Sequence, residues 1–350
     1  GSTTTGQHNV AVGYYANYEN VSGNYNVTMG LQAGRYTTGS NNTALGYQSM
    51  FGLSGQSSAS NNTAVGYQSL YTNTTGSGLT AVGYGALKLN TSGSENTAIG
   101  RNALDANLTG ASNTAVGRDS LGANTTASFN SAFGFNALKA NTTGANNTAV
   151  GEGAMEVNIG GSFNTAMGVS ALDANTTGAD NVALGTYSLS ANTTAGKNTA
   201  VGRSSLSANI TGAQNVAVGY ASLEANTTGF ENVAVGSIAL DANTTGIGNV
   251  AIGEAALTTA TTASYNTGVG RAALRLTTTG ASNTGIGFEA LKANTTGAQN
   301  VSVGANALTT NTTGDNNVAL GIYALEANTT ADDNTAVGTT ALSFNTTGTQ

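Results

Sequence analysis

The chain has no cysteine, proline or tryptophan, and its 350 residues include a single histidine, His8. Without cysteine it forms no disulfide and no thiolate metal site, although this absence does not identify a compartment. With no cysteine and no second histidine, neither a Cys–His pair nor a site of several histidines can be assembled within one chain. We therefore expect no metal, no cofactor and no enzymatic activity.

Charge is also scarce, at 8% of residues, and ten basic against seventeen acidic residues leave a net charge of −7. So few lysines and arginines form no positive stripe, which argues against a nucleic-acid partner. No apolar run approaches the roughly 20 residues of a membrane helix, so we expect no membrane insertion. The chain begins with Gly1 and Ser2 rather than Met, which we interpret as a processed chain or a fragment.

What the sequence does contain is a unit of seventeen residues, present in twenty copies. Its consensus is Asn-Thr-Ala-Val-Gly-x-x-Ala-Leu-x-Ala-Asn-Thr-Thr-Gly-x-x, and we number its positions 1 to 17 from the first Asn. The position-5 glycine recurs at every seventeenth residue from Gly66 to Gly338, whereas three earlier copies are less evenly spaced. A fixed period of this length is typical of a solenoid. We expect irregular coils over residues 1–61 and a regular array over residues 62–350.

Within the unit, positions 2 and 4 alternate with position 3, and their Thr, Val and Ile residues favour a strand. Position 4 is apolar in all twenty copies and position 9 is Leu or Met in eighteen, so we expect these two positions to fill the core. A second short strand is expected around position 9. The Asn-Thr-Thr-Gly segment predicts a turn, because Asn and Gly tolerate the left-handed conformation. The fold class is therefore all-β, a parallel β-solenoid (β-roll or β-helix) of about twenty coils.

Two asparagine columns stand out. Position 1 is Asn in nineteen copies, which we interpret as a ladder of stacked amides, while a row of ligand-binding side chains is the alternative. The residues that represent this ladder and the glycines after it are Asn62, Asn96, Asn113, Asn147, Asn215, Gly66, Gly83 and Gly100. Position 12 is Asn in sixteen copies, and most of these match the glycosylation pattern Asn-x-Thr/Ser, although a turn ladder is the favoured explanation for them. The candidate glycosylation sites are Asn73, Asn141 and Asn226.

Position 3 is small throughout, mostly Ala, where a solvated strand face would vary among polar residues. We infer that something packs against it, and a second chain in a symmetric oligomer, a homotrimer, is the favoured candidate. The alternative is a coil so thin that both of its faces are internal.

The sequence varies most at positions 6, 7, 10, 16 and 17. Position 10 carries many charges, and like charges adjoin there, which is tolerable only in water. Carboxylate neighbours such as Glu156 and Asp173, or Asp332 and Asp333, are interpreted as solvated charges rather than catalytic pairs. Position 6 mixes aromatic residues with Arg, a combination that can hold sugars or a protein surface, although an exposed strand edge has the same composition. The candidate recognition residues are Tyr47, Tyr67, Tyr84, Arg101, Arg118 and Tyr220.

Units such as Asn62-Thr-Ala-Val-Gly-Tyr-Gln-Ser-Leu70, followed by Asn73-Thr-Thr-Gly76, resemble repeats of bacteriophage tail-fibre proteins and large bacterial surface proteins. The Val216-Ala-Val-Gly219 core is also similar to the shorter repeats in the heads of trimeric autotransporter adhesins. The resemblance covers nearly the whole chain, and it implies a homotrimeric, extracellular, adhesive or fibrous solenoid on a cell or virion surface.

Three functions are open at this point. The leading one is an extracellular fibre or adhesin shaft that offers a repetitive face to cell-surface glycans, where avidity compensates for weak single sites. The second is a structural filament formed by end-to-end stacking, because an unprotected solenoid end has free strand edges. The third and least favoured is ice binding, since the adjacent threonines of Asn-Thr-Thr-Gly point to opposite sides.

Overall fold

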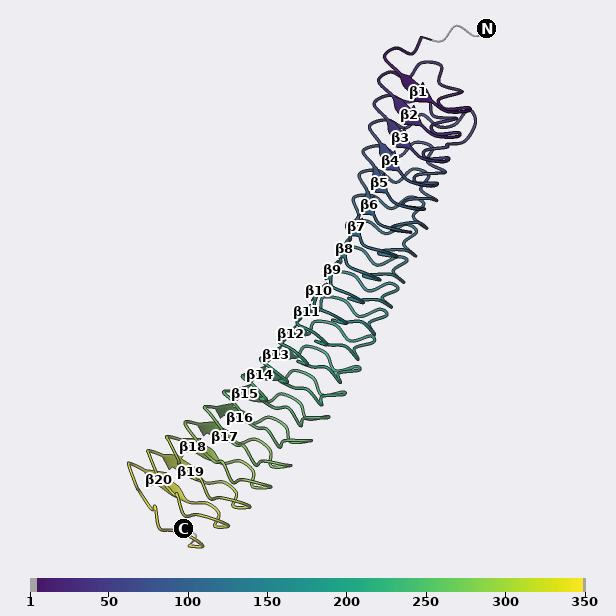
Figure 1. Cartoon of the computed structure of the whole chain (residues 1–350). Helices are drawn as coiled ribbons and strands as arrows, with labels where there is room; N and C mark the ends of the chain where they lie inside the picture. The colour runs from purple at the N-terminus through teal and green to yellow at the C-terminus, as the bar shows by residue number, and fades with distance from the viewer. Residues whose placement is uncertain (1–4, 349–350) are drawn as a thin grey trace. The chain divides into compact units, whose positions relative to one another are not determined.

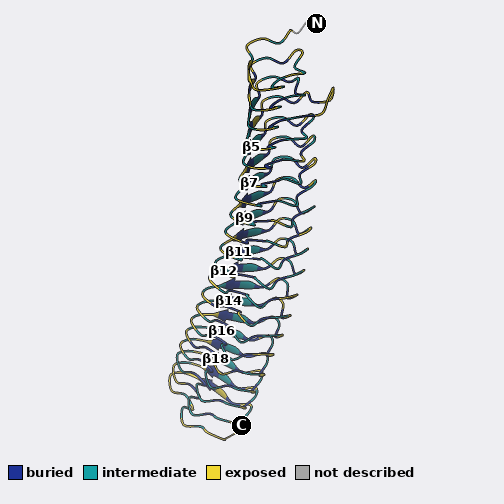
Figure 2. Cartoon of the chain, turned by 45° about the vertical axis from the view of Figure 1, so that its right-hand side comes forward, coloured by how far each residue is buried: buried dark blue, intermediate teal, exposed yellow. Residues whose placement is uncertain are grey.

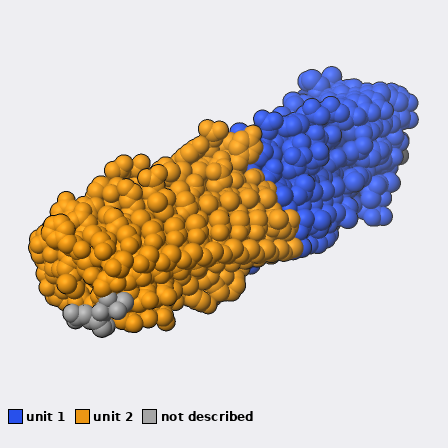
Figure 3. Space-filling view, turned by 90° about the horizontal axis from the view of Figure 1, so that it is seen from below, with its two compact units in different colours: residues 1–179 blue, residues 180–350 orange. Residues whose placement is uncertain are grey.

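The structure, a computed structural model, describes residues 5–348, so the Gly1–Ser2 start lies outside the described residues. Each regular element is a strand of three residues at positions 2 to 4 of a coil, and no helix occurs in the described range. The chain divides into two compact units, residues 1–179 and 180–350, which are described separately (Figure 3).

In unit 1 every strand pairs in parallel with the next strand, and each residue faces the residue at the same position of the following coil (Figure 1). Its strands are β1 Val10–Val12, β2 Val27–Met29, β3 Thr43–Leu45, β4 Thr63–Val65, β5 Thr80–Val82, β6 Thr97–Ile99, β7 Thr114–Val116, β8 Ser131–Phe133, β9 Thr148–Val150 and β10 Thr165–Met167.

Unit 2 repeats the same parallel, in-register pairing. Its strands are β11 Val182–Leu184, β12 Thr199–Val201, β13 Val216–Val218, β14 Val233–Val235, β15 Val250–Ile252, β16 Thr267–Val269, β17 Thr284–Ile286, β18 Val301–Val303, β19 Val318–Leu320 and β20 Thr335–Val337. The predicted all-β class and the parallel β-solenoid are confirmed in each unit.

The core is made by positions 3, 8 and 9, and the expectation that position 4 fills it is wrong. In β13 the middle residue Ala217 is fully buried, while Val216 and Val218 on either side are partly exposed. Leu223, at position 9 of the same coil, is also fully buried. Side chains alternate between the two faces of a strand, so burying position 3 turns positions 2 and 4 outward. Figure 2 shows these buried residues recurring coil after coil within each unit.

This inward position explains why position 3 stays small. At Gly285, an added Cβ would lie 3.1 Å from Cγ of Leu274 and 3.1 Å from the carbonyl oxygen of Ala290. A coil of seventeen residues therefore has room for Ala, but for little more, opposite its leucines. The inference that position 3 packs against another chain is wrong, and so is the alternative that both faces of the coil are internal. Position 3 packs inside its own coil, while positions 2 and 4 face outward and are partly exposed.

The second strand expected at position 9 is also absent from the described coils, because the backbone alternates in conformation there. Gln68 and Leu70, at positions 7 and 9, have φ of 50° and 53°, in the left-handed region that L-residues disfavour. Extended strand geometry cannot pass through such residues. Hydrogen bonds still link the coils, as from the N–H of Leu70 to the carbonyl of Ala86 (2.9 Å).

The chain bends at the Thr-Thr of the Asn-Thr-Thr-Gly segment, but not for the reason expected. Neither Asn73 nor Gly76 has a positive φ. Glycine is needed there for space: an added Cβ at Gly76 would meet the carbonyl oxygen of Gly93 and lie 2.7 Å from Oδ1 of Asn73.

Candidate functional site

The side chains of the position-1 asparagines form hydrogen bonds within their own coil and to the next coil. The Nδ2 of Asn62 donates to the carbonyl of Gly76 in its own coil (3.1 Å), and its Oδ1 accepts the N–H of Leu79 in the next (2.9 Å). Asn96 repeats both bonds, to Gly110 and from Asn113. The same two contacts, in buried surroundings, are made by Asn113, Asn147 and Asn215. With donor and acceptor engaged, this column offers no ligand-binding row.

A second ladder runs through the position-12 asparagines. The Nδ2 of Asn141 donates to Oδ1 of Asn124 one coil back (3.1 Å) and to the carbonyl of Gly144 (2.9 Å). Asn73 and Asn226 lie in the same ladder, and all three of these proposed glycosylation sites are at most 1% exposed. A glycan on Nδ2 would need both the space and the donors that the fold occupies. The folded coil is therefore incompatible with glycosylation at these residues.

The position-5 glycines are structural for two reasons. Gly66, Gly83 and Gly100 have φ of 135° to 137°, a conformation that only glycine adopts without strain. In addition, a Cβ on Gly100 would lie 2.5 Å from the carbonyl oxygen of Gly117 in the next coil. These residues set the distance between coils and carry no binding chemistry.

Three candidate recognition residues do meet on the surface. The rings of Tyr47, Tyr67 and Tyr84 stack one on another, with centroids 5.1 and 5.0 Å apart and interplanar angles of 11° and 5°. They are 39%, 43% and 53% exposed. Because each ring covers the face of its neighbour, this Tyr ladder presents ring edges and hydroxyl groups rather than open aromatic faces.

A ladder of glutamine amides accompanies the tyrosines at position 7. The Nε2 of Gln48 donates to Oε1 of Gln32 (2.8 Å), and the Nε2 of Gln68 donates to Oε1 of Gln48 (2.9 Å). Hydroxyl and amide groups therefore repeat together over neighbouring coils of unit 1.

The other candidate recognition residues are dispersed. Arg118 pairs with Asp119 (3.0 Å) and its guanidinium lies 5.1 Å from the ring centroid of Phe135, so it belongs to a local contact of its own. Arg101 is exposed one coil before it. Tyr220 lies in unit 2, 55% exposed, between Arg203 and Ser237 in the position-6 column.

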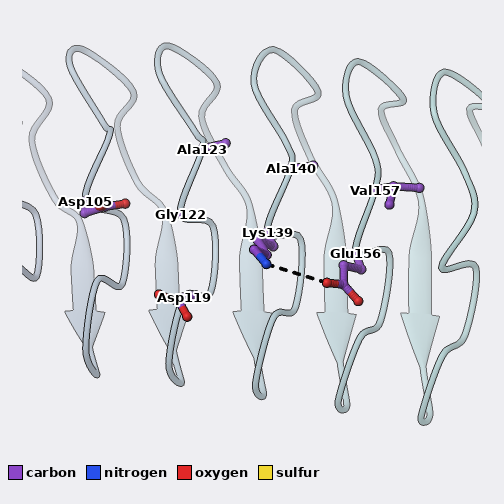
Figure 4. Close-up of a pocket in the computed structure, with 8 residues that line it drawn as sticks. All are labelled: Asp105, Asp119, Gly122, Ala123, Lys139, Ala140, Glu156 and Val157. Carbon is purple, nitrogen blue, oxygen red and sulfur yellow. Dashed lines mark ion pairs between the residues drawn. The ribbon is translucent and has the colours of Figure 1, made fainter.

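A hollow of about 460 Å³ opens in unit 1 where Gly122 interrupts the position-10 column. Its walls include Asp105, Lys139 and Glu156, and Nζ of Lys139 lies 3.8 Å from Oε1 of Glu156 (Figure 4). Partial burial raises the pKa of the Asp105 carboxyl, and the nearby Asp119 carboxylate adds to the shift. Gly122 is the one glycine at position 10, and this interruption was the sequence signal for the hollow.

Sequence reasoning also missed a cluster around Arg35. The guanidinium lies 4.7 Å from the ring centroid of Tyr15 and 4.8 Å from that of Tyr36, with Tyr18 and Phe51 farther out. These residues come from three coils and meet because positions 7, 10 and 11 are adjacent on the solenoid surface. Arginine over aromatic faces stabilises such contacts by cation–π attraction.

Positions 2 and 4 form a surface that the sequence analysis expected in part to be buried, because position 4 was assigned to the core. We call these two outward columns the sheet face. In unit 1 its exposed side chains include Ile99 at 40% and Met167 at 50%, and in unit 2 they include Ile252 and Ile286, each at 40%. None of the 27 charged residues of the chain occupies position 2 or 4.

No group of three His, Cys, Asp or Glu side chains within residues 5–348 is placed to hold a metal ion. His8 is exposed and stacks on Tyr25 at 5.0 Å. Of the neighbouring carboxylates Asp332 and Asp333, Asp332 accepts the N–H of Asp315 (2.7 Å), a contact between coils.

No helix in the described part of the chain has the length and hydrophobicity to cross a membrane.

No protein-family model matches the chain, and no curated protein is similar to it in sequence.

Proposed function

We propose that this chain is the shaft of an extracellular fibre or adhesin, without enzymatic activity, that offers a repetitive surface to glycans on a cell. One observation supports this most strongly. Most coils use the same positions for the core, the asparagine ladders and the coil spacing, whereas positions 6, 10 and 17 vary at the surface. Where neighbouring coils carry the same residue type there, as at Tyr47, Tyr67 and Tyr84, contacts repeat from coil to coil and weak single contacts add up by avidity. The resemblance to tail-fibre and surface-protein repeats agrees with this role.

The Tyr ladder is the favoured contact for such a ligand. Tyrosine combines a large apolar body with a hydroxyl group and loses little entropy when it is immobilised. The adjoining amides of Gln48 and Gln68 add hydrogen-bonding groups at the same spacing.

A glycan array with graded ligand density tests the proposal. We expect binding that rises steeply with density, and we expect it to weaken when Tyr47, Tyr67 and Tyr84 are all replaced by Ser. The matched control replaces three exposed tyrosines that do not stack, Tyr187, Tyr265 and Tyr323. Background binding at every density would overturn the proposal, and an equal loss in the control would remove the Tyr ladder from it.

A structural filament is the second candidate, and the charge-free sheet face would add side-by-side contacts between shafts to the end-to-end stacking expected from the sequence. A large exposed apolar surface usually marks an interaction site. Electron microscopy of concentrated protein would show bundled or continuous fibres if the chain polymerises, whereas discrete particles at all concentrations would argue against it.

Ice binding stays the least favoured function, although the sheet face is a different candidate surface for it from the Asn-Thr-Thr-Gly threonines. Thr at position 2 and an apolar residue at position 4 do share one face, unlike the threonines of Asn-Thr-Thr-Gly. Phe133 and Met167 interrupt the uniformity of that face in unit 1. Thermal hysteresis measures this activity directly, and we expect none.

A further inference from the structure

We propose that the hollow at Gly122 binds an amino sugar of a glycan through the ammonium group of that sugar. The inference rests on the proposed function, because it names a class of glycan that the shaft takes. It concerns a site different from the Tyr ladder. The hollow lies beside positions 10 and 11 of unit 1, whereas Tyr47, Tyr67 and Tyr84 occupy position 6.

The hollow exists because one side chain is missing from an otherwise occupied column. Gly122 has no side chain at position 10, while the preceding and following coils carry Asp105 and Lys139 there. The volume of about 460 Å³ falls within the range of about 300–1,000 Å³ that is usual for small-molecule sites. From Asp105 to Lys139 the chain advances by two coils, or about 10 Å. That length accommodates a single sugar ring with its substituents.

The carboxylate of Asp105 is the charge that the hollow leaves uncompensated. Its Oδ1 lies 3.6 Å from the position that a Cβ of residue 122 would occupy, so this oxygen borders the gap directly (Figure 4). Asp105 forms no ion pair with another of the described residues. Partial burial raises the pKa of its carboxyl, and Lys88 in the preceding coil opposes this shift only weakly. The ammonium group of a ligand would supply the cation that the protein does not place there.

The other charged groups of the hollow are already paired. Asp119 accepts a hydrogen bond from Nε of Arg118 (3.0 Å). Oε1 of Glu156 lies 3.8 Å from Nζ of Lys139 and accepts the amide of Asn136 (2.9 Å). The charge that remains is negative, which disfavours an acidic sugar. An ammonium group and a carboxylate side by side can still bind the hydroxyl groups of a sugar, since a hydroxyl both donates and accepts.

One wall of the hollow is apolar. Ala123, Ala140 and Val157 follow one another at position 11 and lie to one side of the charged groups (Figure 4). The C–H face of a sugar ring can pack on this wall while its substituents reach the charged side. An alkylammonium ion would use the wall and Asp105 but not the hydroxyl-binding groups, and a neutral sugar would leave Asp105 without a cation. An amino sugar is the class that uses all three features.

Saturation-transfer NMR of the whole chain with free glucosamine, N-acetylglucosamine, glucose and butylamine tests the proposal. We expect glucosamine to bind at least about tenfold more tightly than the other three, because it alone combines the charged hydrogen bond to Asp105 with a sugar ring. Asp105→Asn should remove this preference. The matched control is Asp173→Asn, which changes a carboxyl of the same column whose pKa is also raised by burial but which has no glycine beside it at position 10. We expect the control to leave binding unchanged.

Gly122→Tyr gives a second test, because it fills the hollow with a residue that position 10 carries at Tyr18 and Tyr71, and it should abolish binding. Circular dichroism establishes that each variant is folded, and Asp105→Asn serves if the tyrosine variant is not. Failure of glucosamine to bind overturns the proposal, as does equal binding of N-acetylglucosamine, tighter binding of butylamine or an equal effect of the control. Glycan-array binding that rises with density while free glucosamine does not bind overturns this inference alone. Glucosamine binding without any array signal overturns the proposed function alone.

Discussion

The second coil and the regular coils follow the same backbone path but fill it differently. In the second coil, position 3 is Thr28, only 2% exposed, and position 9 is Gly34. In the regular coils position 3 is small and position 9 is leucine or methionine, as in Ala217 and Leu223. An added Cβ at Gly34 would lie 2.7 Å from Cγ2 of Thr28. The volume inside a coil is therefore fixed, and the sequence can divide it between the two positions in more than one way.

The largest expected effect concerns what both kinds of coil share, the glycine at position 5. Gly236→Ala would place a Cβ 2.5 Å from the carbonyl oxygen of Gly253, at a φ of 141°. We expect a loss of more than about 4 kcal/mol or local unfolding, because both strain and a backbone clash oppose it. Hydrogen exchange of the neighbouring coils measures the change, with Ser237→Ala as the control. Tolerance of this alanine would mean that the coil spacing is not set by glycine.

The second prediction transplants the arrangement of the second coil into a regular one. Leu223→Gly leaves a cavity and is expected to cost about 3–5 kcal/mol. Ala217→Thr overfills the coil and is expected to cost about 1–3 kcal/mol. If volume is shared between the two positions, the double variant is more stable than the sum of the single effects predicts, by about 1 kcal/mol. Additive effects in chemical denaturation would contradict the comparison.

The third prediction repairs a break in the position-12 ladder. At Ala260 and Thr277 the amide is missing, and Oδ1 of Asn243 is buried without a hydrogen-bond partner in consequence. We expect Ala260→Asn together with Thr277→Asn to raise the free energy of unfolding by about 1–3 kcal/mol, because the buried acceptor gains its donor. Thermal denaturation measures the change. Ala242→Asn, at position 11 of the preceding coil, is the control and should give no gain.

The smallest effect concerns the carboxylates at position 10. Burial raises the pKa of the Asp241 carboxyl, and the neighbouring Glu224 carboxylate adds to the shift. The folded state therefore binds this proton more tightly than the unfolded state does. At pH values above the raised pKa, the charged carboxylate destabilises the folded state. This destabilisation disappears as the pH falls from neutral through the raised pKa, because the folded protein then takes up the proton.

Asp241→Asn removes that cost. It should stabilise the protein at neutral pH by a few tenths of a kcal/mol, since the group is half exposed and screened by water. The gain should shrink in acid, where the wild-type carboxyl is protonated. Denaturant titrations at the two pH values measure both effects, and a gain that is equal at both would contradict this explanation.

The fold could be predicted well because the period repeats the same physical requirements. Coils that stack in register require the glycine at Gly66 and its equivalents, and they also place Asn62 and its equivalents in an amide ladder. The candidate site could be predicted from the sequence only in part. The stacking of Tyr47, Tyr67 and Tyr84 follows from their shared column, but the cluster around Arg35 joins different positions of neighbouring coils. Only the path of the chain brings those positions together.

By itself the sequence determined the period, the parallel stacking and the glycines and asparagines that hold successive coils together. Alternation along Thr-Ala-Val also established that positions 2 and 4 share one face of the strand and that position 3 lies on the other. Which face points inward was decided by the tertiary structure. Hydrophobicity favours burying valine, but a closed coil of seventeen residues has space only for alanine opposite leucine. The size of the enclosed volume therefore overrode the hydrophobic pattern and left an apolar face on the outside.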